Sequence, residues 1–182
     1  MKRTIVIFGL ISGAISSLLM IITVPFGDRI GIDHSYVIGY TAIVLSFLMV
    51  FFGIKSYRDN VGEGQITFAK AFLIGISITV ISCLLYVITW EIVYYNFMPD
   101  FMDKWTASVV DKLKAAGASA AAIDAKIQQM QRYKELYANP LTNGAMTFME
   151  PFPVGLLITL ISAAVLKRKP QAQAAQAPLP AA

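Results

Sequence analysis

The sequence predicts an all-α membrane protein with four transmembrane helices and a helical hairpin between the third and the fourth. The first observation is composition: 57% of the 182 residues are hydrophobic and only 14% are charged, whereas about 25% of residues in soluble domains are charged. The second is length, because four apolar runs approach the roughly 20 residues that cross a hydrocarbon core. The third is a segment of mixed charge, rich in alanine, between the last two runs.

The first three predicted spans cover about residues 4–26, 36–54 and 69–90. The first two contain no charged residue, and charge in the third is confined to Lys70, near its start. Lys2 and Arg3 precede the first run, as basic residues precede a secretory signal. We expect a retained helix instead, because signal h-regions are shorter and end in a small-x-small cleavage site, whereas this run stays bulky to its end.

The fourth predicted span, about residues 146–166, is the least regular. It is uncharged only from Pro151 to Leu166, and it reaches spanning length only if it includes Glu150. Pro151 and Pro153 restrict the residues before them, so a helix either begins or bends here. A helix that begins here is the simpler expectation and leaves Glu150 just outside it. A bent, discontinuous helix would instead resemble the ion sites of transporters.

Basic residues beside the spans predict the orientation, because positively charged flanks stay in the cytoplasm. With four spans, one side carries eight basic residues and two acidic residues. They are Lys2, Arg3, Lys55, Arg58, Lys70, Lys167, Arg168 and Lys169, with Asp59 and Glu63. The other side carries Arg29 and, from Glu91 to Asn143, six basic and six acidic residues. We therefore expect a multi-pass protein of the bacterial inner (cytoplasmic) membrane with both termini in the cytoplasm.

Residues 91–143 form an extracytoplasmic insert in which about residues 99–138 predict the hairpin. Pro99 suits a first-turn position, Gly117 a helix stop and Ser119 the cap of a second helix. Each helix has one apolar face, made of Phe101, Trp105, Val109 and Leu113 in the first and Ile123, Ile127, Met130 and Tyr137 in the second. This stripe is buried against the hairpin itself and the span ends, against a protein partner or second copy, or against lipid.

The chain is expected to form one four-helix membrane domain over residues 1–169, with the insert as part of it. Residues 170–182 contain only Pro, Gln, Ala and Leu. Such a composition cannot build a packed core, so it predicts a disordered tail.

Several stretches together resemble an uncharacterised bacterial family. They are Gly53-Ile-Lys-Ser-Tyr-Arg-Asp-Asn, Gly64-Gln-Ile-Thr-Phe-Ala-Lys-Ala-Phe-Leu-Ile-Gly75, Leu85-Tyr86, Trp90-Glu91, and Phe148-Met-Glu-Pro-Phe-Pro-Val-Gly155 with Leu166-Lys-Arg-Lys. Over about residues 1–169 the chain resembles the family catalogued as domain of unknown function 4199. The resemblance implies a four-span inner-membrane protein. It brings no assigned activity, so no catalytic residue carries over.

Ionisable groups close to the membrane are the candidate functional residues, because burying one at the bilayer centre costs at least about 2.5–3.5 kcal/mol. Glu91 lies 21 residues after Lys70, or about 31 Å along a helix. Glu150 lies 17 residues before Lys167, or about 25 Å. Both glutamates therefore lie near the outer boundary. With His34 from the first outer loop they are candidate metal ligands, unless each acid is simply solvated or paired, for example with Arg29.

Motifs of known enzymes are missing from the sequence. It contains no nucleophile elbow, phosphate loop, HExxH helix or paired-cysteine motif, and His34 and Cys83 are its only histidine and cysteine. We therefore expect neither an enzyme nor a cofactor. The basic residues lie in short clusters beside apolar runs, which argues against a nucleic-acid partner.

The preferred prediction is an interaction or structural subunit in the lipid bilayer, whose hairpin contacts a membrane or periplasmic protein. The alternative is a small transporter or cation-binding protein that uses an acidic cluster in the outer leaflet. Small residues at helical spacing predict close helix contacts within the bundle or, alternatively, in a homo-oligomer. They are Gly9, Gly13 and Ser17 in the first span and Ala71, Gly75 and Thr79 in the third.

Overall fold

Helices make up almost all of the part of the chain that the computed structural model describes. This part comprises residues 1–23 and 32–168, without the side chains of residues 32–36. The helices are α1 (Lys2–Thr23), α3 (Ile32–Asn60), α4 (Phe68–Phe97), α5 (Phe101–Ala115), α6 (Ala120–Ala138), α7 (Pro140–Met149) and α8 (Phe152–Leu166). The predicted tail and Arg29 of the first outer loop lie outside the described residues.

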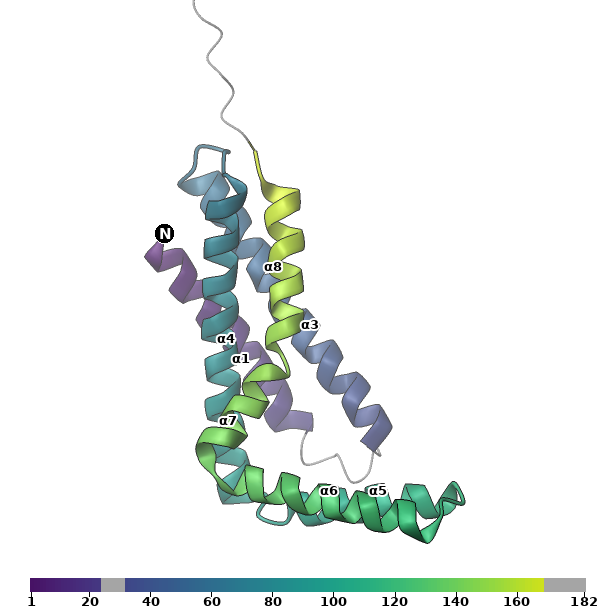
Figure 1. Ribbon diagram of the computed structural model, residues 1–182. Coiled ribbons are helices and arrows are strands. Elements are labelled where there is room, and N and C mark those ends of the chain that lie inside the picture. The colour runs from purple at the N-terminus through teal and green to yellow at the C-terminus, as the bar shows by residue number, and fades with distance from the viewer. Residues whose placement is uncertain (24–31, 169–182) are drawn as a thin grey trace, which may run out of the picture.

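Four segments are long and apolar enough to cross a membrane, which confirms the predicted fold class. They are α1, most of α3, α4, and α7 with α8 taken together. In Figure 1, α1, α3, α4 and α8 run lengthwise through one bundle, and α5 and α6 lie across one end of it. We call this the hairpin end. The start of α1 and the end of α8 lie at the opposite, terminal end.

The third span is longer than its apolar run. Thr67 caps α4, since its hydroxyl accepts a hydrogen bond from the backbone N–H of Lys70 at 3.4 Å. The helix then continues for 30 residues to Phe97, a length of about 45 Å. It passes through Glu91 because the next turn carries Tyr94, which is buried against the hairpin. Trp90 and Glu91 therefore lie inside the helix and not at its end.

The fourth span is discontinuous: α8 begins at the prolines, as expected, with Glu150 outside it, but another helix, α7, precedes the break. Asn139 caps α7 by accepting a hydrogen bond from the backbone N–H of Leu141 at 2.9 Å. The chain is helical from Pro140 to Met149, breaks at Glu150 and Pro151, and resumes in α8. Because proline has no N–H to donate, Pro151 and Pro153 interrupt the ladder of hydrogen bonds between the two helices. Each alternative is therefore right in part: a helix begins at the prolines, and the span as a whole is broken there.

The apolar core lies toward the terminal end, where α3, α4 and α8 meet. Phe47, Val50, Ile54, Ile74 and Ile78 are among its fully buried side chains. The close approach of α4 explains why α1 has small residues on the face that contacts it. A Cβ on Gly9 would lie 2.8 Å from Ile81, and one on Gly13 would lie 2.5 Å from Leu85. These glycines therefore bring two helices of the same chain together.

Buried hydroxyl groups link the spans within the core. Ser12 Oγ donates a hydrogen bond to the Ser46 carbonyl at 2.9 Å and lies 3.0 Å from Ser82 Oγ. A hydroxyl has one proton, so Ser82 must be the donor in the second bond. Thr79 Oγ1 and Thr159 Oγ1 lie 3.0 Å apart between α4 and α8. Such bonds satisfy polar groups away from water and fix the register of neighbouring helices.

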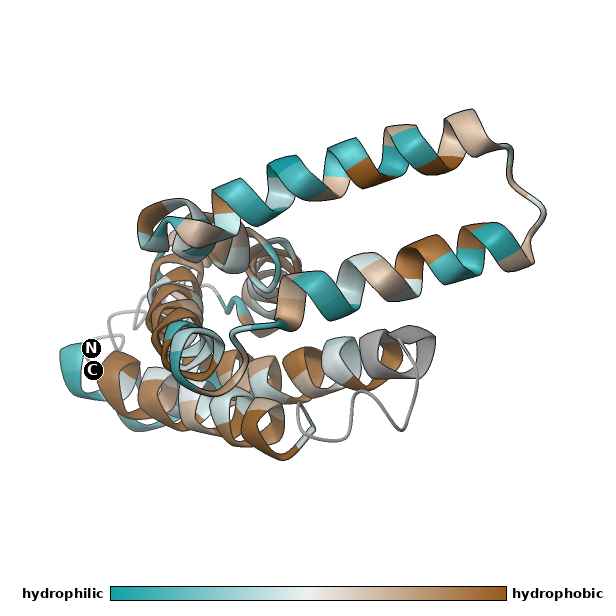
Figure 2. Cartoon of the chain, turned by 90° about the horizontal axis from the view of Figure 1, so that it is seen from below, coloured by the Kyte–Doolittle hydropathy of each residue, from teal (hydrophilic) through white to brown (hydrophobic). Residues whose placement is uncertain are grey.

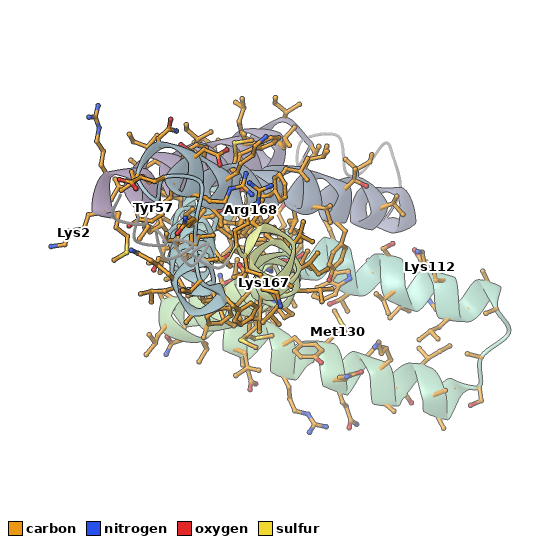
Figure 3. The ribbon with its side chains drawn as sticks, turned by 90° about the horizontal axis from the view of Figure 1, so that it is seen from above. Lys2, Tyr57, Lys112, Met130, Lys167 and Arg168 are labelled. Atoms are coloured by element: carbon orange, nitrogen blue, oxygen red, sulfur yellow. The ribbon has the colours of Figure 1, made fainter. Side chains whose placement is uncertain are left out.

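The terminal end is closed by a short backbone pairing. Ile66 in the α3–α4 loop and Arg168 after α8 each donate their N–H to the other's carbonyl, at 3.1 and 2.9 Å. Figure 3 shows Lys2, Lys167 and Arg168 at this end, with Tyr57 close to Arg168 in the view. Basic residues at the ends of α1, α3, α4 and α8 lie at this end, and which side of the membrane it faces stays a prediction.

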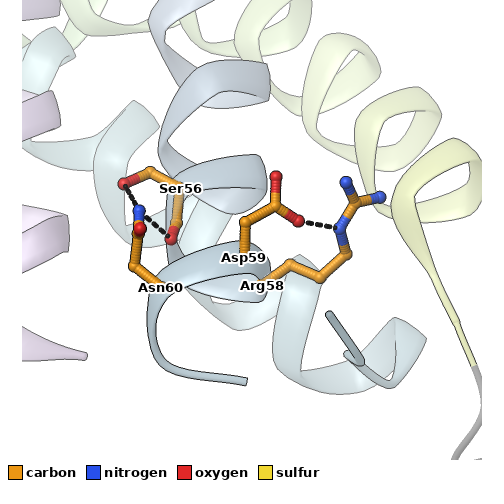
Figure 4. A network of polar contacts seen from close by, with 4 residues as sticks. All are labelled: Ser56, Arg58, Asp59 and Asn60. Carbon is orange, nitrogen blue, oxygen red and sulfur yellow. Dashed lines mark hydrogen bonds and ion pairs between the residues drawn. The ribbon is translucent and has the colours of Figure 1, made fainter. Parts of the chain in front are cut away.

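Local contacts organise the last turn of α3 at the same end. Arg58 Nε donates a hydrogen bond to Asp59 Oδ1 at 2.7 Å, and Asn60 Nδ2 donates one to the Ser56 carbonyl at 2.9 Å (Figure 4). The Lys70 ammonium lies over the ring of buried Tyr57, 5.3 Å from its centroid. Asp59, one of two acidic residues on this side, is thus paired and leaves the end strongly basic.

Candidate functional site

The hairpin consists of α5 and α6, joined by a turn at Gly117. Gly117 has a φ of +70°, which favours glycine, and Ser119 caps α6 by accepting a hydrogen bond from the Ala122 N–H at 3.3 Å. Both predictions are confirmed. Pro99 is different, because it precedes α5 and Asp100 takes the cap position. In Figure 2 the two helices lie side by side and project well past the spans.

The base of the hairpin, next to the spans, is well packed. Its distal half, about residues 109–127 around the turn, is less well packed. Met102 of α5 and Met130 of α6 are each 1% exposed. Trp105 stacks on Tyr133 with 6.4 Å between ring centroids, and Lys134 forms an ion pair with Asp103. Toward the turn, the predicted apolar stripe is only half-buried. Its residues there are Val109, Leu113, Ile123 and Ile127.

A cluster of aromatic side chains, which we call the aromatic base, joins the hairpin to α4. It consists of Trp90, Tyr94, Phe101, Trp105, Tyr133 and Tyr137 around the two methionines. The Trp90 ring meets the Phe101 ring edge-on at 5.2 Å, and Tyr94 lies 5.8 Å from Tyr137. Tyr95 adds a hydrogen bond to the Tyr137 carbonyl at 2.8 Å. The apolar stripe is thus buried at its base against the hairpin itself and a span end.

A polar cluster lies directly beside the aromatic base, between α4 and α7. We define it as Trp90, Glu91, Asn143 and Thr147. Trp90 Nε1 donates a hydrogen bond to Asn143 Oδ1 at 3.1 Å, and Thr147 Oγ1 donates one to the same oxygen at 3.2 Å. Asn143 is completely buried. Trp90 belongs to both clusters, so the polar cluster is coupled to the position of the hairpin.

Two buried atoms of the polar cluster have no hydrogen-bond partner among the described residues. They are Asn143 Nδ2 and Glu91 Oε1. Glu91 Oε1 faces α7, since a Cβ on Gly144 would lie 3.5 Å from it. Buried polar atoms without partners are rare in folded proteins and point to strain, function or a bound water or ion.

Glu150 lies in the break between α7 and α8, and it remains accessible. Its carboxylate is within interaction range of the Tyr86 side chain of α4. Glu91 and Glu150 thus approach the same α4–α7 contact but have different neighbours. Those neighbours place them at different levels, because Tyr86 and Glu91 are five residues apart on α4, or about 7.5 Å.

The predicted metal site stays a prediction. Within residues 1–23 and 37–168, no group of three or more His, Cys, Asp and Glu side chains gathers closely enough to hold a metal ion. The His34 side chain lies outside the described residues, so its distance from Glu91 and Glu150 is not known.

Sequence reasoning identified Glu91 as a candidate but missed the polar residues of α7, one of which, Asn143, accepts the hydrogen bond of Trp90. Asn139, Asn143 and Thr147 recur every four residues, which places them on one face of a helix. The signal that could have found them is Asn139-Pro140, because a capping asparagine followed by proline is a typical helix start.

Comparison with known proteins gives a family but no activity. No curated protein and no solved structure matches the chain. A family model described as "Protein of unknown function (DUF4199)" matches residues 7–168, which includes all four candidate spans except the first residues of α1. The chain therefore belongs to the DUF4199 family and is a multi-pass membrane protein of that family.

Proposed function

We propose that the protein is a non-enzymatic interaction or structural subunit of the bacterial inner membrane, whose hairpin holds an extracytoplasmic protein partner. One observation carries this proposal: the hairpin projects past the bundle (Figure 2) while its distal half packs mainly on itself. Among the described residues, this part of the hairpin covers little of the rest of the chain, which suits it to contact another molecule. The excess of basic residues at the terminal end supports an extracytoplasmic hairpin.

The aromatic base supports a rigid arm. Helices of 15 and 19 residues are marginal in isolation, since helices below about 12–15 residues rarely form alone in water and slightly longer ones gain little. Each well-placed aromatic pair adds about 0.5–1.5 kcal/mol beyond its buried area. Several such pairs at the base would hold the distal half at a fixed angle to the spans. A fixed arm loses less entropy on binding than a flexible one.

The distal half carries both signs of charge, with no excess of either large enough to steer a strongly charged partner. Its charged residues include Asp111, Lys112, Lys114, Asp124 and Lys126. Half-buried Val109, Leu113, Ile123 and Ile127 lie between them. A partner with a mixed apolar and polar surface fits this pattern, and its affinity should depend only weakly on salt.

Copurification from the native membrane tests the proposal. A variant that replaces residues 109–127 by a short glycine-serine turn keeps Met102, Met130 and the whole aromatic base. We expect one protein to copurify with the full chain and to be lost with this variant, while both forms insert and stay folded. If the same protein remains bound to the shortened chain, or if only the chain itself is recovered, contact with a protein partner through the hairpin is wrong.

A second candidate function, cation binding or transport, rests on a different observation. Glu91 and Glu150 both approach the α4–α7 contact, and Glu150 lies in a helix break, where transporters place their ion sites. Glu91→Gln and Glu150→Gln variants in liposomes would test it. Loss of ion flux or of bound metal in both variants, with copurification unchanged, would favour this candidate over the first.

A further inference from the structure

We propose that the terminal end binds the phosphate group of an anionic phospholipid. The site consists of Lys55 and Arg58 of α3 and of Arg168, just past the end of α8. It lies at the opposite end of the bundle from the hairpin (Figure 1), so the proposal does not depend on the function of the hairpin. The starting observation is the excess of positive charge at this end.

The three basic side chains of the site share the carboxylate of Asp59. Arg58 Nε donates a hydrogen bond to Asp59 Oδ1 at 2.7 Å, and Lys55 and Arg168 also lie within electrostatic range of this carboxylate. Asp59 balances one of the three positive charges, so two remain. Like charges in one place repel each other, and an anion between them removes the repulsion.

Backbone hydrogen bonds hold these side chains in place. Arg168 and Ile66 exchange two such bonds, at 2.9 and 3.1 Å, and the Gly64 N–H donates one to the Arg58 carbonyl at 2.9 Å. The α3–α4 loop thus joins the end of α3 to the end of α8. The Arg58 side chain is only 16% exposed, and its two terminal nitrogens point away from Asp59 (Figure 4). Such amino groups fit two oxygens of one phosphate.

Apolar faces on both helices lead to these cations and favour a lipid over a soluble anion. Phe52 is exposed three residues before Lys55, on the same face of α3. Ile161 and Val165 are exposed one turn apart on α8, and Arg168 follows three residues later. The apolar residues lie in candidate membrane spans, where exposed side chains contact acyl chains. A phospholipid would therefore place its acyl chains along the helices and its phosphate at the basic end, as anionic lipids do at basic sites between spans.

Native mass spectrometry of the full chain tests the site, with equal amounts of phosphatidylglycerol and phosphatidylcholine that have the same acyl chains. We expect phosphatidylglycerol to stay bound in preference. Arg168→Gln should lower this preference by about fivefold, the contribution of one basic residue close to anionic lipid. The variant should fold, because the pairing with Ile66 uses backbone atoms. The matched control is Lys2→Gln, which removes one charge from the same end. It should leave the preference unchanged, because Lys2 points away from Arg168 (Figure 3).

Two further variants separate the charge from a structural role. Arg168→Lys keeps the charge and should keep most of the preference. Lys55→Gln repeats the test on an exposed side chain if Arg168→Gln does not fold. The proposal is overturned if the wild-type protein binds both lipids equally, or if Lys2→Gln weakens the preference as much as Arg168→Gln. Displacement of the lipid by glycerol phosphate, which has no acyl chains, would also overturn it, since the site would then bind a soluble phosphate.

Discussion

The two methionines inside the aromatic base allow a quantitative test of how the hairpin is held. Met102 and Met130 come from different helices, and each is only 1% exposed. Removing a buried methionine side chain to alanine costs about 2–5 kcal/mol, depending on how far the cavity collapses. Because 1.4 kcal/mol corresponds to a factor of ten, Met102→Ala should raise the opening equilibrium of the hairpin by about 30-fold to several thousand-fold.

Hydrogen exchange in nanodiscs measures this effect directly, since amide exchange reports local opening in each helix. We expect faster exchange in α5 and α6 and little change in the core of α3, α4 and α8, because the methionines lie in a cluster separate from that core. Leu136→Ala is the matched control, as Leu136 is on α6 but 42% exposed. Unchanged exchange in α5 and α6, or equal loss of protection in the spans, would refute the reasoning.

Three other predictions concern the spans. Gly13→Ala should lower the thermal unfolding temperature in detergent, because the new Cβ would lie 2.5 Å from Leu85 and overpacking costs about 1–3 kcal/mol; Gly39→Ala, with open space, should not lower it. Thr159→Val should destabilise the bundle by about 0.6–1.7 kcal/mol through loss of its bond to Thr79, and an equally stable variant would contradict this. Reporter fusions in the α3–α4 loop and after α8 should report cytoplasm, and one in the α5–α6 turn the outside; an outside signal after α8 would refute the orientation.

The architecture could be predicted because it depends on quantities that are local in the sequence. The lengths of the uncharged runs predict where α1, α3 and α4 lie. Gly117 and Ser119 predict where α5 ends and α6 begins. The limits of α4 and of the fourth span could not be predicted in the same way. Glu91 is tolerated inside a helix because Tyr94, one turn further, packs on a hairpin that begins four residues after α4 ends.

Only part of the candidate site could be predicted from the sequence, because the rest depends on contacts between distant helices. A glutamate near a membrane boundary attracts notice from its charge alone, and so Glu91 and Glu150 were identified. Asn143 matters because Trp90 points at it from another helix, and no pattern within α7 reveals that neighbour. The break at Glu150 needed the same long-range information, since prolines permit both a helix start and a bend.

Site-specific photo-crosslinking in native membranes tests the central claim most directly. A photoreactive residue would be placed at Ala116 and at Ala121, both exposed on the distal half of the hairpin. The control position is Val165, which is 67% exposed on α8 within a membrane span. The account predicts a discrete crosslinked protein from both hairpin positions and none from α8. Crosslinks from the hairpin to lipid alone, or the same protein crosslinked from all three positions, would contradict it.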